Sequence, residues 1–144
     1  MRPIIKGLLA GCVVLLVLAG VGVMMAARFW QQNKGRLQAQ AAQIRAQGQE
    51  FGRSATDAEC VAETLRTYRK DSSIFSQVHS RVWLSACLES SRRDSGYCAA
   101  VPPESEIMRS VTWRLAECSR AGLDGDKGCT RIIAEVQKHC DKAR

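Results

Sequence analysis

The sequence predicts an all-α protein: a single N-terminal transmembrane helix and then a small, disulfide-stapled helical domain of about four helices. Two observations carry this prediction, an uninterrupted apolar run from Gly7 to Ala27 and six cysteines that all lie beyond it. Apolar residues after the run recur every three or four positions and never alternate as in a strand. We therefore expect an N-terminal tail (1–6), a transmembrane helix (7–27), a Gln/Ala-rich helical spacer (28–55) and a cysteine-rich α-helical domain (56–144).

The apolar run has the length of a membrane span. It contains 21 residues and no charged side chain, and a helix of that length is about 31 Å long, enough to cross a bilayer core. A cleaved signal peptide has a shorter apolar core and small residues before the cleavage site, whereas cleavage after Ala27 would leave Met25 at position −3. We therefore favour a retained anchor.

Two short patterns lie inside this run. Residues 9–12, Leu-Ala-Gly-Cys, resemble the lipobox of bacterial lipoproteins, and this resemblance implies lipidation of Cys12. Lys6 interrupts the preceding apolar region, however, and fifteen apolar residues would remain after processing, so we interpret Cys12 as a small residue of the span. Small residues four apart, at Gly7 and Gly11 and again at Gly22 and Ala26, have the spacing that lets membrane helices approach closely. Such pairs are common by chance in spans rich in Gly and Ala, so a homo-oligomer formed through this helix is kept as a hypothesis.

The spacer begins at the expected membrane interface. Arg28, Phe29 and Trp30 are residue types that anchor at lipid headgroups. Four apolar residues that follow have heptad spacing, namely Leu37, Ala41, Ile44 and Phe51. Because Gly48 interrupts this short seam, we expect a solvated helical spacer rather than a coiled coil.

The domain itself is expected to be helical throughout. Thr56 and Glu59 form a capping box that opens the first helix. Further helices are expected at about 72–90, in a short segment at 97–101, from the proline pair 102–103 to Gly122, and at about 127–141. We expect four aromatic side chains to lie in the core: Tyr68, Phe75, Trp83 and Trp113.

The cysteines favour three structural disulfides. Cys87 and Cys98, like Cys118 and Cys129, are eleven residues apart and flank a polar turn that contains glycine, so each pair is placed to staple a helical hairpin. Cys129 and Cys140 lie on one expected helix and are too far apart to bond. The remaining bond then joins Cys60 to Cys140.

Charge and cysteine usage bear on partners and location. Residues 1–52 carry six Lys or Arg against one acidic residue, whereas residues 53–144 carry fifteen basic and thirteen acidic side chains. The basic excess therefore flanks the span, where lipid headgroups account for it, and we expect no nucleic-acid binding. Six thiols without zinc-type spacing fit an oxidising compartment, and the absence of a glycosylation sequon together with the Ala and Arg bias favours a bacterial periplasm.

No catalytic or metal motif stands out. His139 and Cys140 are adjacent, and neighbours on a helix diverge by about 100°, so we expect no shared metal. Residues 124–135 lack the glycine that an EF-hand requires at its sixth position. Both histidines, His79 and His139, are expected at the surface or on helix flanks. We expect no catalytic residues, no cofactor and no enzymatic activity.

The functional hypothesis is a binding or scaffolding module. A single-pass protein of the bacterial inner membrane, with a cytoplasmic N-terminus, would hold its domain in the periplasm for another envelope protein of unknown identity. Two alternatives stay open. One is a small envelope enzyme or enzyme inhibitor with an unrecognised surface site, and the other is a cytosolic thiol or metal protein of opposite topology.

Overall fold

A computed structural model describes residues 2–93 and 95–144, and the side chains within this part except those of residues 2–10, 13 and 95. The predicted all-α class is confirmed for the described chain, which contains helices, turns and one isolated bridge between Thr56 and Arg92. In order the helices are α1 (Arg2–Gly52), α2 (Asp57–Tyr68), α3 (Ile74–Ser90), α4 (Ser95–Ala100), α5 (Ile107–Arg120) and α6 (Lys127–Ala143).

The chain forms two compact units, one that ends at Gln40 and one that comprises Ala41–Arg144. Helix α1 runs from the first unit into the second. The sequence placed the start of the domain at residue 56, but the last turns of α1 already belong to the second unit. These turns pack on α3, where the Phe51 and Trp83 rings lie 5.3 Å apart.

The first part of α1 is long and apolar enough to cross a membrane, and it is the one helix of the described chain that meets this description. Its large apolar side chains are exposed, among them Leu16 (73%) and Met25 (68%). The tail at 1–6, the start of the span and the Leu9 and Ala10 side chains of the lipobox-like motif lie outside the described side chains. Phe29 and Trp30, expected at the interface, are 69% and 66% exposed.

Two glycines bring the end of α1 close to α3. A Cβ atom at Gly48 would collide with the Trp83 carbonyl oxygen, and one at Gly52 would collide with the Cys87 carbonyl oxygen. Glycine permits this approach because it has no side chain. Gly48 is therefore a contact point with the domain rather than a mere interruption of the spacer.

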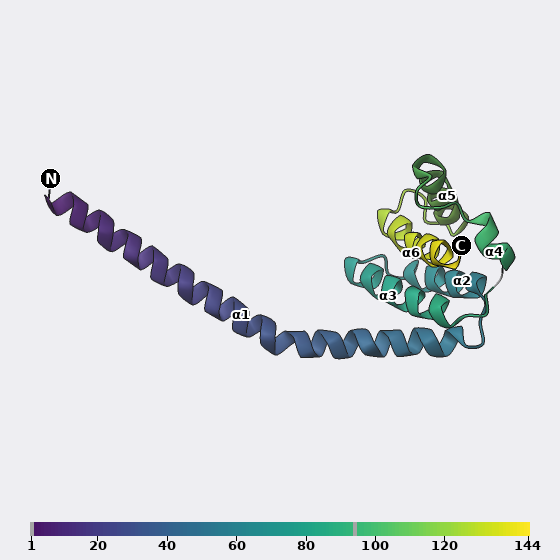
Figure 1. Cartoon of the computed structure of the whole chain (residues 1–144), viewed down its shortest axis with the longest axis horizontal. Coiled ribbons are helices and arrows are strands. Elements are labelled where there is room, and N and C mark those ends of the chain that lie inside the picture. The colour runs from purple at the N-terminus through teal and green to yellow at the C-terminus, as the bar shows by residue number, and fades with distance from the viewer. Residues whose placement is uncertain (1, 94) are drawn as a thin grey trace. The chain divides into compact units, whose positions relative to one another are not determined.

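Helices α2, α3 and α6 form the centre of the second unit, and α5 lies outside them against α6 (Figure 1). The predicted capping box is confirmed: Thr56 Oγ1 accepts from the Glu59 amide, and Glu59 Oε2 accepts from the Thr56 amide at 2.7 Å. The core side chains of these three helices are largely or wholly buried and include Leu65, Tyr68, Leu84, Leu88, Ile132, Ile133 and Val136.

Three disulfides connect the helices, and only one of the three predicted pairs is correct. Cys118–Cys129 is confirmed, and it closes the α5–α6 hairpin around Gly122 and Gly125, which both have positive φ. The other bonds are Cys60–Cys87 and Cys98–Cys140.

The predicted Cys87–Cys98 and Cys60–Cys140 pairs are wrong because the chain after α3 does not turn back as a hairpin. It leaves α3 in an extended conformation, and the Arg92 amide donates to the Ala55 carbonyl at 2.9 Å. This path carries α4 towards the end of α6, so Cys98 meets Cys140. Cys87 instead faces α2, where its Cα lies 5.9 Å from that of Cys60.

Helix α5 begins later than predicted and buries less. It starts at Ile107, four residues after the proline pair, and its fully buried residues are Ser110 and Cys118.

The four aromatic side chains expected in the core differ in burial. Phe75 on α3 is 74% exposed, whereas Tyr68 is buried and Trp83 and Trp113 are half-buried.

Candidate functional site

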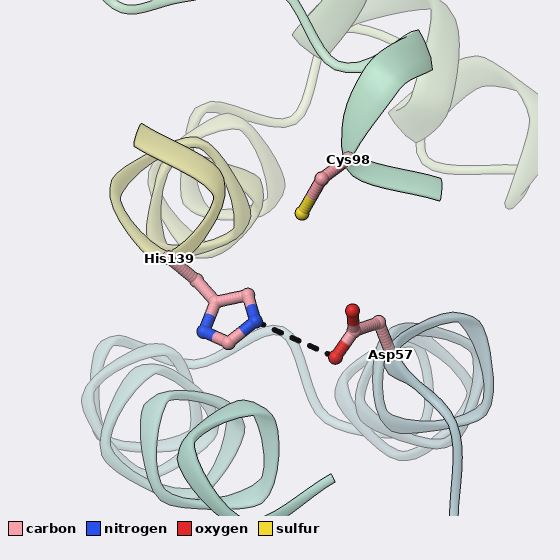
Figure 2. Close-up of side chains that lie close together, drawn as sticks. All are labelled: Asp57, Cys98 and His139. Atoms are coloured by element: carbon pink, nitrogen blue, oxygen red, sulfur yellow. Dashed lines mark ion pairs between the residues drawn. The ribbon is translucent and has the colours of Figure 1, made fainter. Parts of the chain in front are cut away.

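An acidic and an imidazole side chain meet inside the second unit. Asp57 is the first residue of α2 and His139 lies in the last turns of α6. Figure 2 shows the ring directed at the carboxylate, with His139 Nε2 3.5 Å from Asp57 Oδ1. The Asp57 side chain is 1% exposed and that of His139 is 10% exposed. Two groups that can both carry charge are thus withdrawn from water at the junction of α2 and α6.

Ser91 holds one oxygen of this carboxylate. It caps the C-terminal end of α3, and its hydroxyl lies 2.5 Å from Asp57 Oδ1 and 2.9 Å from the Leu88 carbonyl oxygen. The other oxygen, Asp57 Oδ2, is buried and has no hydrogen-bond partner among the described residues, and the same holds for His139 Nε2. Because buried polar atoms are nearly always paired, two such atoms in one place call for an explanation, such as a bound water molecule or an ion.

Burial keeps the imidazole neutral. It lowers the pKa of His139 below its ordinary value, while the Asp57 carboxylate acts in the opposite direction and less strongly. Nearby Arg93 lowers the pKa of His139 further. A neutral imidazole has a free lone pair on one nitrogen, which is the form that binds metal ions. Close by, burial also raises the pKa of the Tyr97 hydroxyl, so that phenol stays protonated.

A sulfur atom completes this cluster. One ligand atom each of Asp57, His139 and Cys98 lies within 4.8 Å of the other two, and Figure 2 shows the Cys98 sulfur directed towards the other side chains. Cys98 is bonded to Cys140, so its sulfur carries no thiolate charge in this state. Asp57 and both of these cysteines line a surface pocket of about 380 Å³, and Arg93 and Arg144 lie at the same pocket.

The second candidate is a surface on α5, which we call the α5 stripe. Its four side chains are large, apolar and exposed by about half or more: Ile107 (71%), Met108 (79%), Val111 (47%) and Leu115 (48%). Their spacing places them along one side of the helix. Helix α5 packs chiefly on α6, so the stripe has no cover within the described chain.

The sequence singled out the cysteines of this region, but it did not predict the contact between Asp57 and His139. All six domain cysteines are in disulfides, and Cys12 is a free, exposed cysteine. His139, expected at the surface or on a helix flank, has a side chain that is only 10% exposed, because α6 packs along α3 and turns this residue towards the start of α2. No sequence pattern links Asp57 to His139, because 81 residues separate them and they meet only where α2 and α6 pack together.

Comparison with known protein families, with curated proteins and with solved structures finds no match to this chain.

Proposed function

We propose that this protein is a membrane-anchored binding module of the bacterial envelope, with a cytoplasmic N-terminus and its disulfide-stapled domain in the periplasm. The apolar part of α1 supports an anchor, and three disulfides in one small domain support an oxidising compartment. The domain binds another envelope protein through the α5 stripe.

The α5 stripe is the observation that carries this proposal. Exposed large apolar side chains scattered singly are ordinary, but a contiguous group on one helix marks an interaction surface. Met108 is 79% exposed and Ile107 is 71% exposed, although both lie on a helix whose last turn is fixed by the Cys118–Cys129 bond. A fixed helix with an open apolar side is suited to receive an apolar helix or groove of a partner.

A protein partner fits this surface better than a lipid bilayer. Helices that lie on membranes carry an excess of Lys and Arg on their polar side. On α5, Arg109 is paired with the N-cap residue Glu106 and Arg120 with Glu117, and the third cation, Arg114, donates to the Ser110 hydroxyl. These pairs leave little net positive charge to attract anionic headgroups, so apolar contact with another protein is the interaction that the helix favours.

Photo-crosslinking from single positions in living cells tests this binding role. A photoreactive residue at Met108 or Val111 should crosslink the full-length protein to one discrete protein, and the same probe at exposed Arg131 on α6 should not. The substitution Val111→Glu should abolish the crosslink from Met108. Equal products from all three positions, or adducts with lipid alone, would contradict the proposal.

Thiol mapping tests the location. Intact cells are alkylated with and without prior reduction, and the cysteine peptides are identified by mass spectrometry. Six blocked domain cysteines with Cys12 free are expected for an exported domain. Six free domain thiols would instead indicate the opposite topology, with the domain in the cytoplasm.

A further inference from the structure

We propose that Asp57, His139 and Cys98 form a zinc site that becomes available when the Cys98–Cys140 disulfide is reduced. The site is distinct from the α5 stripe, and it does not depend on the binding role proposed above.

The geometry already brings the three ligands together. Asp57 comes from α2, Cys98 from α4 and His139 from α6, and their ligand atoms lie within 4.8 Å of one another. In a tetrahedral zinc site, with bonds of about 2.0–2.3 Å, neighbouring ligand atoms are about 3.3–3.8 Å apart. His139 Nε2 lies 3.5 Å from Asp57 Oδ1, already in that range, and the unpaired Oδ2 belongs to the same carboxylate. The Cys98 sulfur, within 4.8 Å of the chosen carboxylate and imidazole atoms, must move inward to complete the set.

The unpaired atoms supply the second line of support. Asp57 Oδ2 and His139 Nε2 are buried, and neither has a hydrogen-bond partner among the described residues. An ionised carboxylate oxygen and the lone pair of a neutral imidazole are ordinary zinc donors. A metal ion between them would satisfy two atoms that the folded chain otherwise leaves unpaired.

The charges balance within the cluster. One carboxylate, one thiolate and one neutral imidazole carry two negative charges, which a divalent cation neutralises. A neutral site avoids the cost of burying net charge, which is large in a protein interior. A water molecule, admitted through the pocket beside Cys98 and Cys140, would be the fourth ligand.

Reduction opens the site. A dithiol reductant donates two electrons and two protons to the Cys98–Cys140 bond, giving two thiols and leaving the reductant as a disulfide. Zinc then binds Cys98 as the thiolate and releases one proton. In the oxidised state Cys98 has no thiolate to offer, so the disulfide closes the site.

One substitution exposes the Cys98 thiol without any reductant. The full-length Cys140→Ala protein, with Cys12→Ser to remove the other free thiol, is purified in detergent micelles and titrated with Co²⁺ as the probe. We expect one equivalent to bind, with a tetrahedral d–d spectrum and a thiolate-to-cobalt charge-transfer band, and Zn²⁺ to displace it. His139→Gln or Asp57→Asn, added to this background, should weaken binding at least about tenfold.

The matched control is Cys129→Ala in the same background. It frees the Cys118 thiol, which belongs to no group of potential metal ligands within the described chain. Co²⁺ binding as tight as in Cys140→Ala, or binding that His139→Gln leaves unchanged, would overturn the site. Equally tight binding by the oxidised wild-type protein would overturn the redox gate.

A second measurement covers the case in which Cys140→Ala fails to fold, as judged by circular dichroism. The wild-type protein is reduced with a phosphine and alkylated in the presence or absence of Zn²⁺. Zinc should slow alkylation of Cys98 but not of Cys118, and His139→Gln should remove the difference. Equal rates at Cys98 and Cys118 with zinc present would overturn the proposal.

Discussion

Helices α5 and α6 are joined by a short hairpin and a disulfide, yet they place their apolar residues in different surroundings. On α6, Ile132, Ile133 and Val136 are completely buried, because the helix lies between α3 and α5 and also contacts α2. On α5, apolar residues at the same helical spacing are exposed. Periodicity therefore reports that a helix has an apolar side, and the number of neighbouring helices decides whether that side is core or binding surface.

The largest contrast is expected from one substitution made in both helices. Ile132→Ala on α6 should lower the free energy of unfolding by about 2–5 kcal/mol, because it leaves a cavity among buried side chains. Ile107→Ala on α5, where the side chain is 71% exposed, should change it by less than about 0.5 kcal/mol. Denaturant unfolding of the full-length protein in detergent, followed by tryptophan fluorescence, measures both. Similar losses would show that the α5 stripe is part of the core.

The Cys118–Cys129 bond is expected to matter more for α5 than for α6. Its removal by Cys118→Ala with Cys129→Ala opens a loop with a sequence separation of 11 residues, at a cost of about 3 kcal/mol. Because α5 has few buried side chains of its own, its amides should lose protection from hydrogen exchange while those of α6 keep theirs. Equal loss in both helices would mean that the two form a single cooperative unit.

A buried polar link also ties α5 to α6. The Gln137 amide accepts from the Ser110 hydroxyl at 3.0 Å and donates to the Pro102 carbonyl at 2.9 Å. Gln137→Met preserves much of the side-chain volume but removes both bonds, and it should cost about 1–3 kcal/mol because the Pro102 oxygen is left without this donor. Lys138→Met, on the exposed neighbour, is the control. If the two variants have the same denaturant midpoint, the link between α5 and α6 is contradicted.

The smallest effect concerns pH and the buried end of α6. Burial lowers the pKa of His139, and the charges of Asp57 and Glu89 oppose this while those of Arg93 and Lys142 reinforce it. The unfolded chain therefore takes up a proton at a higher pH than the folded chain does. Stability should be full above about pH 6.5 and should fall as the pH drops below this value.

His139→Gln is the variant that tests this pH dependence. It should flatten the dependence of the denaturant midpoint between about pH 7 and pH 5. His79→Gln, which alters the half-buried histidine of α3, serves as the control. An unchanged slope in His139→Gln would place the titrating group elsewhere.

Local signals in the sequence were sufficient for most helix boundaries, although not for the start of α5. The Thr56 and Glu59 capping box, the Gly122 turn and the start of α6 at Lys127 depend on neighbours within a few residues, and all three are found in the structure. The same locality explains the correct Cys118–Cys129 pair, whose two cysteines flank one tight turn.

Longer-range features were not predictable in the same way. The partners of Cys60 and Cys98 depend on the extended path after α3, which has no strong sequence pattern. The exposure of Phe75 and Val111 depends on which helices lie beside them. The contact between Asp57 and His139 depends on the chain path and on helix packing together. The two residues come from α2 and α6, and they meet only after these helices have packed.

The close approach of α1 to α3 constrains how this sequence changes during evolution. Any side chain at Gly48 or Gly52 would collide with a backbone carbonyl of α3, which no rotamer change relieves. Alanine, otherwise the better helix former, should therefore be selected against at both positions in descendant genes. Exposed Gln49 and Glu50 between them should drift freely, so this four-residue glycine spacing would identify distant homologues whose anchors and surfaces have diverged.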